Sequence, residues 1–197
     1  DRPYYEARKP DVPALLLELL SHQNLADQRY GLDPKFRFQV ARSVYKGILR
    51  YISFTEKKPF IVQPLPVSKF AITPVAGKRI RLSWEPVPDS LEPSAKPDRY
   101  VLYMRTGDGG FDNGTVLYTN STELELDSFN TIYSFRVTAA NDGGESLDSE
   151  ILAVGLVKSD EKPVLVVNGF DRICAPAMFD TGNMAGVAWW NDRGVAD

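Results

Sequence analysis

The sequence has one cysteine and one histidine in 197 residues, and it lacks the features that mark several special classes of protein. A single cysteine, Cys174, excludes an internal disulfide. No apolar stretch approaches the ~18 residues of a membrane-spanning helix. A net charge of -3 leaves no excess of lysine and arginine, so nucleic acid is not an expected partner. With 43% hydrophobic and 25% charged residues, the composition is that of one or two globular domains.

The strongest structural signal is the stretch 131–141, with the sequence TIYSFRVTAAN. One side of an extended strand there carries the apolar residues Tyr133, Phe135, Val137 and Ala139. The other side carries Ser134, Arg136 and Thr138, and we expect that side to face water. Residues 80–84, IRLSW, alternate in the same way and end on Trp84, which packs well only between two sheets. We therefore predict a β-sandwich between residues 68 and 158.

The order of motifs within these residues resembles the fibronectin type III family. The resemblance is carried by Phe70–Ile72, by Trp84 followed by Pro86, by YVLY at 100–103 and by Tyr133 ahead of FRVTAAN at 135–141. It implies that Tyr133 is buried and that its hydroxyl bonds back to nearby backbone. It also implies a scaffold or spacer, because a fold by itself specifies no activity.

The first 56 residues predict a different kind of structure. Residues 12–20, VPALLLELL, are almost all apolar, which indicates a strand buried on both faces of an α/β sheet, although the same composition also fits a helix. A polar loop follows, and then Asp33 and Pro34 indicate the start of a helix. We expect that helix to end near Phe54, because apolar residues recur at Phe36, Val40, Val44, Ile48 and Tyr51. Together these elements form one corner of an α/β domain, too small to fold alone.

This corner resembles the C-terminal end of the zinc-dependent N-acetylmuramoyl-L-alanine amidases. The matching segments are PALLLE at 13–18, LSHQN at 20–24, Asp27, and ARSVYKGILRY at 41–51. By this resemblance Glu18 is the catalytic residue, an acid/base beside a zinc-bound water. A carboxylate at the end of a buried strand has the raised proton affinity that such a role needs. The alternative for Glu18 is a carboxylate that is simply solvated or paired with an arginine.

The zinc site of that family cannot be built from this sequence. Its ligands are two histidines and a glutamate, whereas His22 is the only histidine here. His22 is better explained as a loop residue than as a ligand. We therefore expect no cofactor in this chain, and zinc only in the domain of the parent protein. This chain alone should be inactive, and whether its parent is an enzyme stays open.

Two further segments bear on function. Residues 57–67 contain three prolines, which predicts an extended, semi-rigid linker. The aromatic residues Tyr103, Phe111 and Tyr118 fit either a sugar-stacking platform or a cover for the edge of the sandwich.

The last residues, 159–197, predict the start of a further α/β domain. Val164–Val167 has the composition of a buried strand and is followed by a polar loop. Cys174 is better explained as a small buried residue than as a nucleophile, because His22 lies far away in another unit. The chain starts without an initiator methionine or a signal peptide, so we expect it to begin inside a longer protein.

The predicted organisation is mainly β, with a fibronectin type III-like sandwich flanked by partial α/β segments. Residues 1–56 are the end of an amidase-like domain, 57–67 the linker, 68–158 the sandwich, and 159–197 the start of another domain. The functional hypothesis is a fragment of a secreted or periplasmic bacterial cell-wall hydrolase acting on peptidoglycan, with the sandwich as spacer. The alternative is a non-catalytic glycan-binding or spacing module of a polysaccharide-degrading enzyme. Other domains of the same parent are the expected protein partners.

Overall fold

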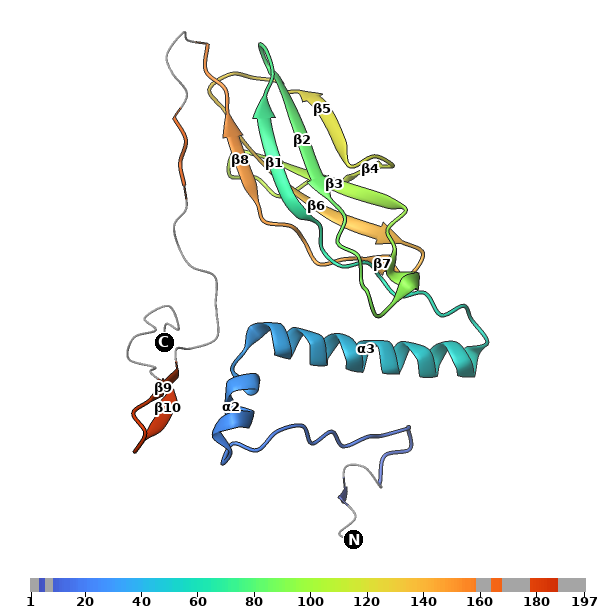
Figure 1. Cartoon of the computed structure of the whole chain (residues 1–197). Helices are drawn as coiled ribbons and strands as arrows, with labels where there is room; N and C mark the ends of the chain where they lie inside the picture. Colours follow the sequence, from blue (N-terminus) through green and yellow to red (C-terminus); the bar gives the residue numbers. More distant parts are fainter. Residues whose placement is uncertain (1–3, 6–8, 159–163, 168–177, 188–197) are drawn as a thin grey trace. The chain divides into compact units, whose positions relative to one another are not determined.

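The computed structural model describes residues 4–5, 9–158, 164–167 and 178–187, which are the coloured parts of Figure 1. The chain divides into two compact units, one of residues 1–45 with 166–197 and the other of residues 46–165. Cys174 lies outside the described residues, so its predicted burial has no structural counterpart here.

Residues 46–165 contain a sandwich of two antiparallel sheets. One sheet has the order β1-β2-β5, formed by β1 (Ser68–Pro74), β2 (Arg79–Glu85) and β5 (Ser121–Glu125). The other has the order β4-β3-β6-β7, with β8 also paired to β6. Its strands are β3 (Arg99–Thr106), β4 (Thr115–Leu117), β6 (Ile132–Asn141), β7 (Gly144–Glu145) and β8 (Leu152–Gly155). A short 3-10 helix, η1 (Pro93–Ala95), lies between β2 and β3. The described fold is therefore mainly β.

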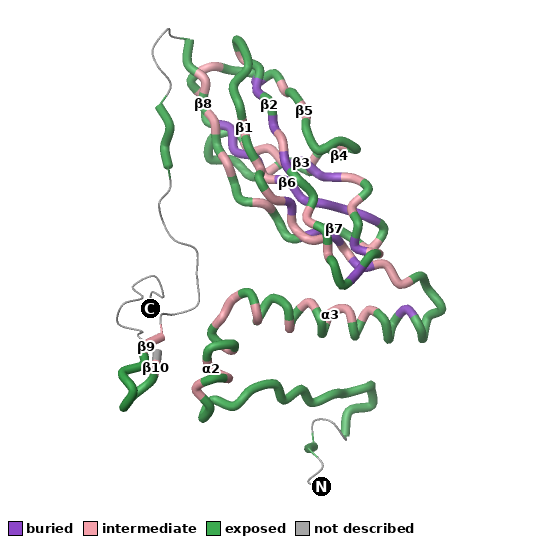
Figure 2. The backbone as a smooth tube through the Cα atoms, in the orientation of Figure 1, coloured by how far each residue is buried: buried purple, intermediate pink, exposed green. Residues whose placement is uncertain are grey.

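The core lies between the two sheets, where the buried segments in Figure 2 gather. On β2 the alternation predicted from sequence is present, because Ile80, Leu82 and Trp84 are buried while their neighbours Arg79 and Arg81 are exposed. The Trp84 ring meets Phe70 and Tyr100 edge-on, with ring centroids 6.4 and 5.4 Å away. Burial also raises the pKa of the Tyr100 phenol.

Tyr133 makes the corner contact that the resemblance implies. Its ring is 1% exposed, and its hydroxyl oxygen accepts a hydrogen bond from the backbone N–H of Ser128 at 3.0 Å. The bond gives a buried phenol a partner and fixes the loop that leads into β6. The prediction for Tyr133 is confirmed.

Strand β6 is buried on both faces, which corrects the expectation that one face meets water. Ser134 and Thr138 on the supposedly wet face are 2% and 3% exposed. β6 is a central strand, paired with β3 along one edge and with β7 and β8 along the other, so side chains of neighbouring strands flank both of its faces. Alternation decides which way a side chain points but not what covers it. Here long side chains of the same sheet supply the cover.

Two helices of the described residues lie before the sandwich in the sequence. The predicted long helix is α3 (Pro34–Glu56), and the N–H of Lys35 bonds to the Oδ1 atom of Asp33 at 2.9 Å, as expected for its N-terminal cap. A second helix, α2 (Leu25–Gly31), takes the place of the loop expected there. Asn24 caps α2, with its side chain accepting from the N–H of Ala26 at 2.9 Å.

The two apolar runs outside the sandwich are not strands in the described structure, contrary to expectation. Residues 12–20 have no strand assignment, and Leu15 is 86% exposed. Val164–Val167 is likewise unpaired, with exposures of 76 to 88%. A strand is stable only when the N–H and C=O groups of its backbone are hydrogen-bonded to neighbouring strands, and no described residue pairs with either run.

The described residues also include a short antiparallel hairpin near the C-terminus, which joins β9 (Met178–Asp180) to β10 (Ala185–Val187).

No helix in the described parts of the chain is long and apolar enough to cross a membrane. The longest, α3, carries five basic residues, which are Lys35, Arg37, Arg42, Lys46 and Arg50.

Candidate functional site

The residue proposed as catalytic, Glu18, lies in the extended apolar run that precedes α2. It is exposed, and no ion pair joins it to any of the described residues. Its neighbours on the same side of an extended chain are Leu16 and Leu20, which are 43% and 40% exposed. The carboxylate is therefore not locked in a surface salt bridge within the described chain.

The end of the run is tied to α2 by hydrogen bonds. The backbone N–H of Ser21 donates to the Oδ2 atom of Asp27 at 3.0 Å, and the side-chain amide of Gln28 donates to the carbonyl oxygen of His22. A Cβ added at Gly31 would lie 3.4 Å from the Leu20 side chain, so the end of α2 lies next to that residue. The segment after Glu18 thus turns at a defined point.

The described residues do not fit a zinc site. No group of three or more His, Cys, Asp or Glu side chains is placed to hold a metal ion anywhere in the described ranges. His22 contributes its backbone carbonyl to the loop. A catalytic zinc needs three protein ligands with one open position, and the residues around Glu18 do not supply them.

The outer face of β3 and β6 carries a stack of aromatic and cationic side chains. The guanidinium of Arg136 lies 4.8 Å from the ring centre of Tyr103 and 4.6 Å from that of Phe111. Arg105 lies 5.2 Å from the Phe111 ring and donates to the hydroxyl of Ser134 at 3.1 Å. Cation–π contacts of this kind can stabilise the outer face of a sheet, which does not pack against the hydrophobic core.

Two carboxylates, those of Glu145 and Asp148, bind the side chains of this stack. The hydroxyl groups of Tyr103 and Thr138 both donate to the Oε2 atom of Glu145, each at 2.8 Å. Arg136 also pairs with Asp148 at 2.5 Å. Burial, followed by the hydrogen bond to Glu145, raises the pKa of Tyr103 to about 12. These contacts explain why Ser134 and Thr138 are buried on the outer face.

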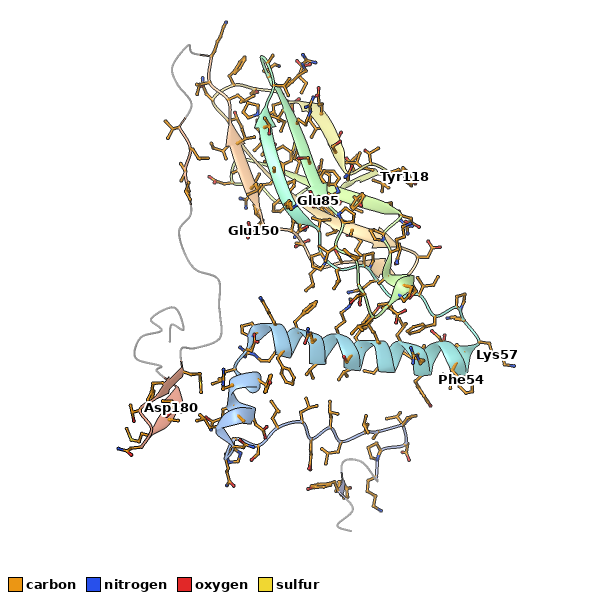
Figure 3. All side chains as sticks on the ribbon, in the orientation of Figure 1. Phe54, Lys57, Glu85, Tyr118, Glu150 and Asp180 are labelled. Atoms are coloured by element: carbon orange, nitrogen blue, oxygen red, sulfur yellow. The ribbon has the colours of Figure 1, made fainter. Side chains whose placement is uncertain are left out.

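The three aromatic residues considered for sugar stacking do not form one platform. Tyr103 and Phe111 are partly buried in the stack, where a guanidinium lies over each ring. Tyr118 is 78% exposed and makes no ring contact with the other two among the described residues. Figure 3 labels it near the edge strands β4 and β5. Tyr103 and Phe111 therefore act as a cover for the sheet.

The proline-rich segment 57–67 packs along the sandwich. Val62 is fully buried, and its N–H donates to the hydroxyl of Ser94 at 3.2 Å. Its carbonyl accepts from the side-chain amide of Asn141 at 2.9 Å, and the same amide reaches the carbonyls of Ser94 and Lys96 at 3.0 and 3.3 Å. A Cβ at Gly143 would come within 2.5 Å of the Ile61 carbonyl oxygen, so only glycine fits there.

Asn141 is the anchoring residue that sequence reasoning missed. It is 5% exposed at the C-terminal end of β6, directly after the small apolar residues Ala139 and Ala140. A buried amide needs several partners, and the linker and the η1 turn provide them. The signal available in the sequence was this amide at the end of the most buried strand.

Comparison with known proteins identifies the sandwich. Residues 65–154 match the family model of the fibronectin type III domain. The twitchin kinase region from C. elegans is 22% identical and has a TM-score of 0.44, and the match covers 51% of this chain and 18% of that one. A fibronectin type III domain of human collagen XX is 26% identical over 48% of this chain and 96% of that one, with a TM-score of 0.37. The chain thus spans less than a fifth of the twitchin structure. No curated protein sequence gives a significant match.

Proposed function

We propose that residues 65–154, which are a fibronectin type III domain, serve as the spacer of a secreted or periplasmic bacterial cell-wall hydrolase. Fibronectin domains are spacer or scaffold modules in multidomain proteins, and their fold alone specifies no chemistry. In this proposal residues 1–56 end an amidase-like domain that cuts peptidoglycan. Its bond would be the amide between muramic acid and L-alanine.

The observation that supports this proposal is the apolar surface left open before the sandwich. Leu15, Leu17 and Leu19 are 86%, 49% and 52% exposed, although they follow one another on one side of an extended chain. On α3, Val44, Ile48 and Tyr51 recur at helical spacing and are 39 to 56% exposed. Such surfaces are costly in water, because each buried leucine would contribute ~1.5–3 kcal/mol. An α/β domain in the parent protein would cover them.

Glu18 would be the proton-transfer residue of that domain. Placed at the end of a strand that its domain covers, the carboxyl group would take a proton from the attacking water and deliver it to the amide nitrogen that leaves. The metal ligands of such an enzyme would be two histidines and a glutamate, and because this sequence has a single histidine, they would come from other parts of the parent protein.

A non-catalytic spacing module of a polysaccharide-degrading enzyme is the second candidate. It is favoured by the self-sufficiency of the sandwich, whose core cluster of buried residues comes entirely from residues 67–139. In that case Glu18 would be a solvated carboxylate with no catalytic part. The two candidates differ in what Glu18 does.

The test is peptidoglycan cleavage by the full-length parent protein with zinc present, comparing Glu18→Gln with the unchanged enzyme. Loss of a general acid or base lowers the rate by about 10²- to 10⁴-fold, and we expect a loss of that size with zinc still bound. Asp11→Asn is the matched control, because Asp11 is also an exposed acid near the apolar run. Equal rates for Glu18→Gln and the unchanged enzyme would leave the spacing module as the better description.

A further inference from the structure

The second half of α3 presents one polar face to partners within residues 46–165. Lys46, Arg50 and Ser53 are spaced three and four residues apart, so they share one side of the helix. Lys46 pairs with the Oδ2 atom of Asp89 at 3.0 Å, and the Arg50 guanidinium lies 4.9 Å from the Phe60 ring centre. Each of these residues therefore contacts either the linker or the β2–β3 connection.

The ion pair between Lys46 and Asp89 is more sheltered than the ion pairs on the sheets. Its side chains are 18% and 9% exposed, whereas those of Lys69 and Glu85 are 73% and 54% exposed. Water screens an exposed pair almost completely, so the sheltered pair contributes more per contact. Removing one partner would leave a poorly hydrated charge behind.

The chain reverses sharply at the end of α3. Lys57 has a positive φ of 53°, and the N–H of Lys58 donates to the carbonyl of Ser53 at 2.9 Å. These are the features of a helix end closed by a residue in the left-handed region. The hydroxyl of Ser53, itself buried, then reaches the carbonyl of Pro59 at 3.4 Å. Residues Pro59 and Phe60 of the linker therefore lie beside the last turns of α3, where they contact Ser53 and Arg50.

We propose that residues 46–67 are an orientation clamp, an added element of this fibronectin domain that holds residues 46–56 of α3 in one fixed direction against the sandwich. The Lys46–Asp89 pair and the Arg50–Phe60 contact hold the helix, while Asn141 and Ser94 hold the linker at Val62. A free tether would need none of these contacts. The clamp is independent of the hydrolase proposal, because it concerns only residues 46–165.

The test measures the distance between spin labels on the helix and on the sandwich in the 197-residue chain. Phe54→Cys and Tyr118→Cys supply the sites, since both side chains are about four-fifths exposed and both are labelled in Figure 3. Cys174→Ser removes the only native thiol. The test variant combines Lys46→Met with Arg50→Ala, and Lys69→Met is the control, because it removes an exposed ion pair of the sandwich.

We expect one narrow distribution of spin-label distances in the labelled chain without further changes and in the Lys69→Met control. The variant with Lys46→Met and Arg50→Ala should give a broader distribution, because the ratio of molecules with residues 46–56 held against the sandwich to molecules with them released should fall about tenfold. A broad distribution in the parent, or a double variant as narrow as the parent, would overturn the clamp. Asp89→Asn is a second variant that keeps the oxygen accepting from the Leu91 N–H while removing the charge, and it should broaden the distribution in the same direction.

Discussion

Leucine behaves differently in the two regions of this molecule. Leu82 in β2 is fully buried, whereas Leu15 in the run before α2 is 86% exposed. Both lie in extended segments, but β2 has β1 on one side and β5 on the other, and its core side chains pack against those of the second sheet. An apolar composition therefore shows where a core can form, and the presence of neighbouring strands decides whether it does form.

The largest effect is expected from truncating the sandwich core. Phe135→Ala should cost ~3–5 kcal/mol in the free energy of unfolding, because the ring is fully buried and would leave a cavity. Leu15→Ala in the same chain should change the free energy of unfolding by less than about 0.5 kcal/mol. Urea unfolding of the two variants measures the difference.

Leu15→Ala is expected to have a much larger effect in the full-length parent protein than in this chain. If a domain there covers residues 12–20, Leu15→Ala should cost ~2–5 kcal/mol in the unfolding of that domain. An unchanged midpoint in the parent would count against the α/β interpretation of this run. Figure 2 shows the same run exposed along its length in the present chain.

An intermediate effect is expected at the anchor between linker and sandwich. Asn141→Ala removes one amide that bonds to three carbonyls, which should cost ~2–3 kcal/mol because buried acceptors are left without a partner. Asn113→Ala in an exposed loop is the matched control, with a change below about 0.5 kcal/mol. Limited proteolysis between residues 57 and 67 should accelerate only in the Asn141 variant. Equal cleavage in both variants would show that the amide does not hold the linker.

The smallest effect is a pH dependence at the stack on the outer sheet face. Because burial and the Glu145 hydrogen bond raise the pKa of Tyr103 to about 12, the folded state binds this proton more tightly than the unfolded chain does. The resulting stability is fully present below pH ~10 and is lost as pH rises from ~10 to ~12. Urea unfolding against pH should show a shallower fall in Tyr103→Phe than in the parent. Parallel curves would contradict the raised pKa.

Much of the sandwich could be read from the sequence, because its determinants are local. Alternation in β2 and β6 placed Trp84 and Phe135 in the core, and the tyrosine corner at Tyr133 followed from the family resemblance. The helix beginning at Pro34 followed from its cap and apolar spacing. The sequence predicts correctly to which side of β6 each side chain points, but not whether that side is buried. Ser134 and Thr138 are buried by side chains of other strands and loops, and no local sequence pattern links those residues to them.

The candidate site shows the same limit more strongly. The motif around Glu18 predicts a catalytic role for this residue, but such a role would need neighbouring strands to cover it, and the described chain leaves the residue exposed. Asn141 was overlooked because its three acceptors lie 45 to 79 residues away in sequence. A single buried amide gives no periodic signal.

The mainly β sandwich, the direction of its core side chains and the long helix before it are all specified by the spacing of residues along single elements, and so they can be predicted from the amino-acid sequence. The cover on both faces of β6 and the attachment of the linker by Asn141 become visible only in the folded chain. The same is true of the contacts that Lys46 and Arg50 of α3 make with Asp89 and Phe60. These features join residues far apart in the chain, and such contacts are favourable only after the whole fold has brought them together.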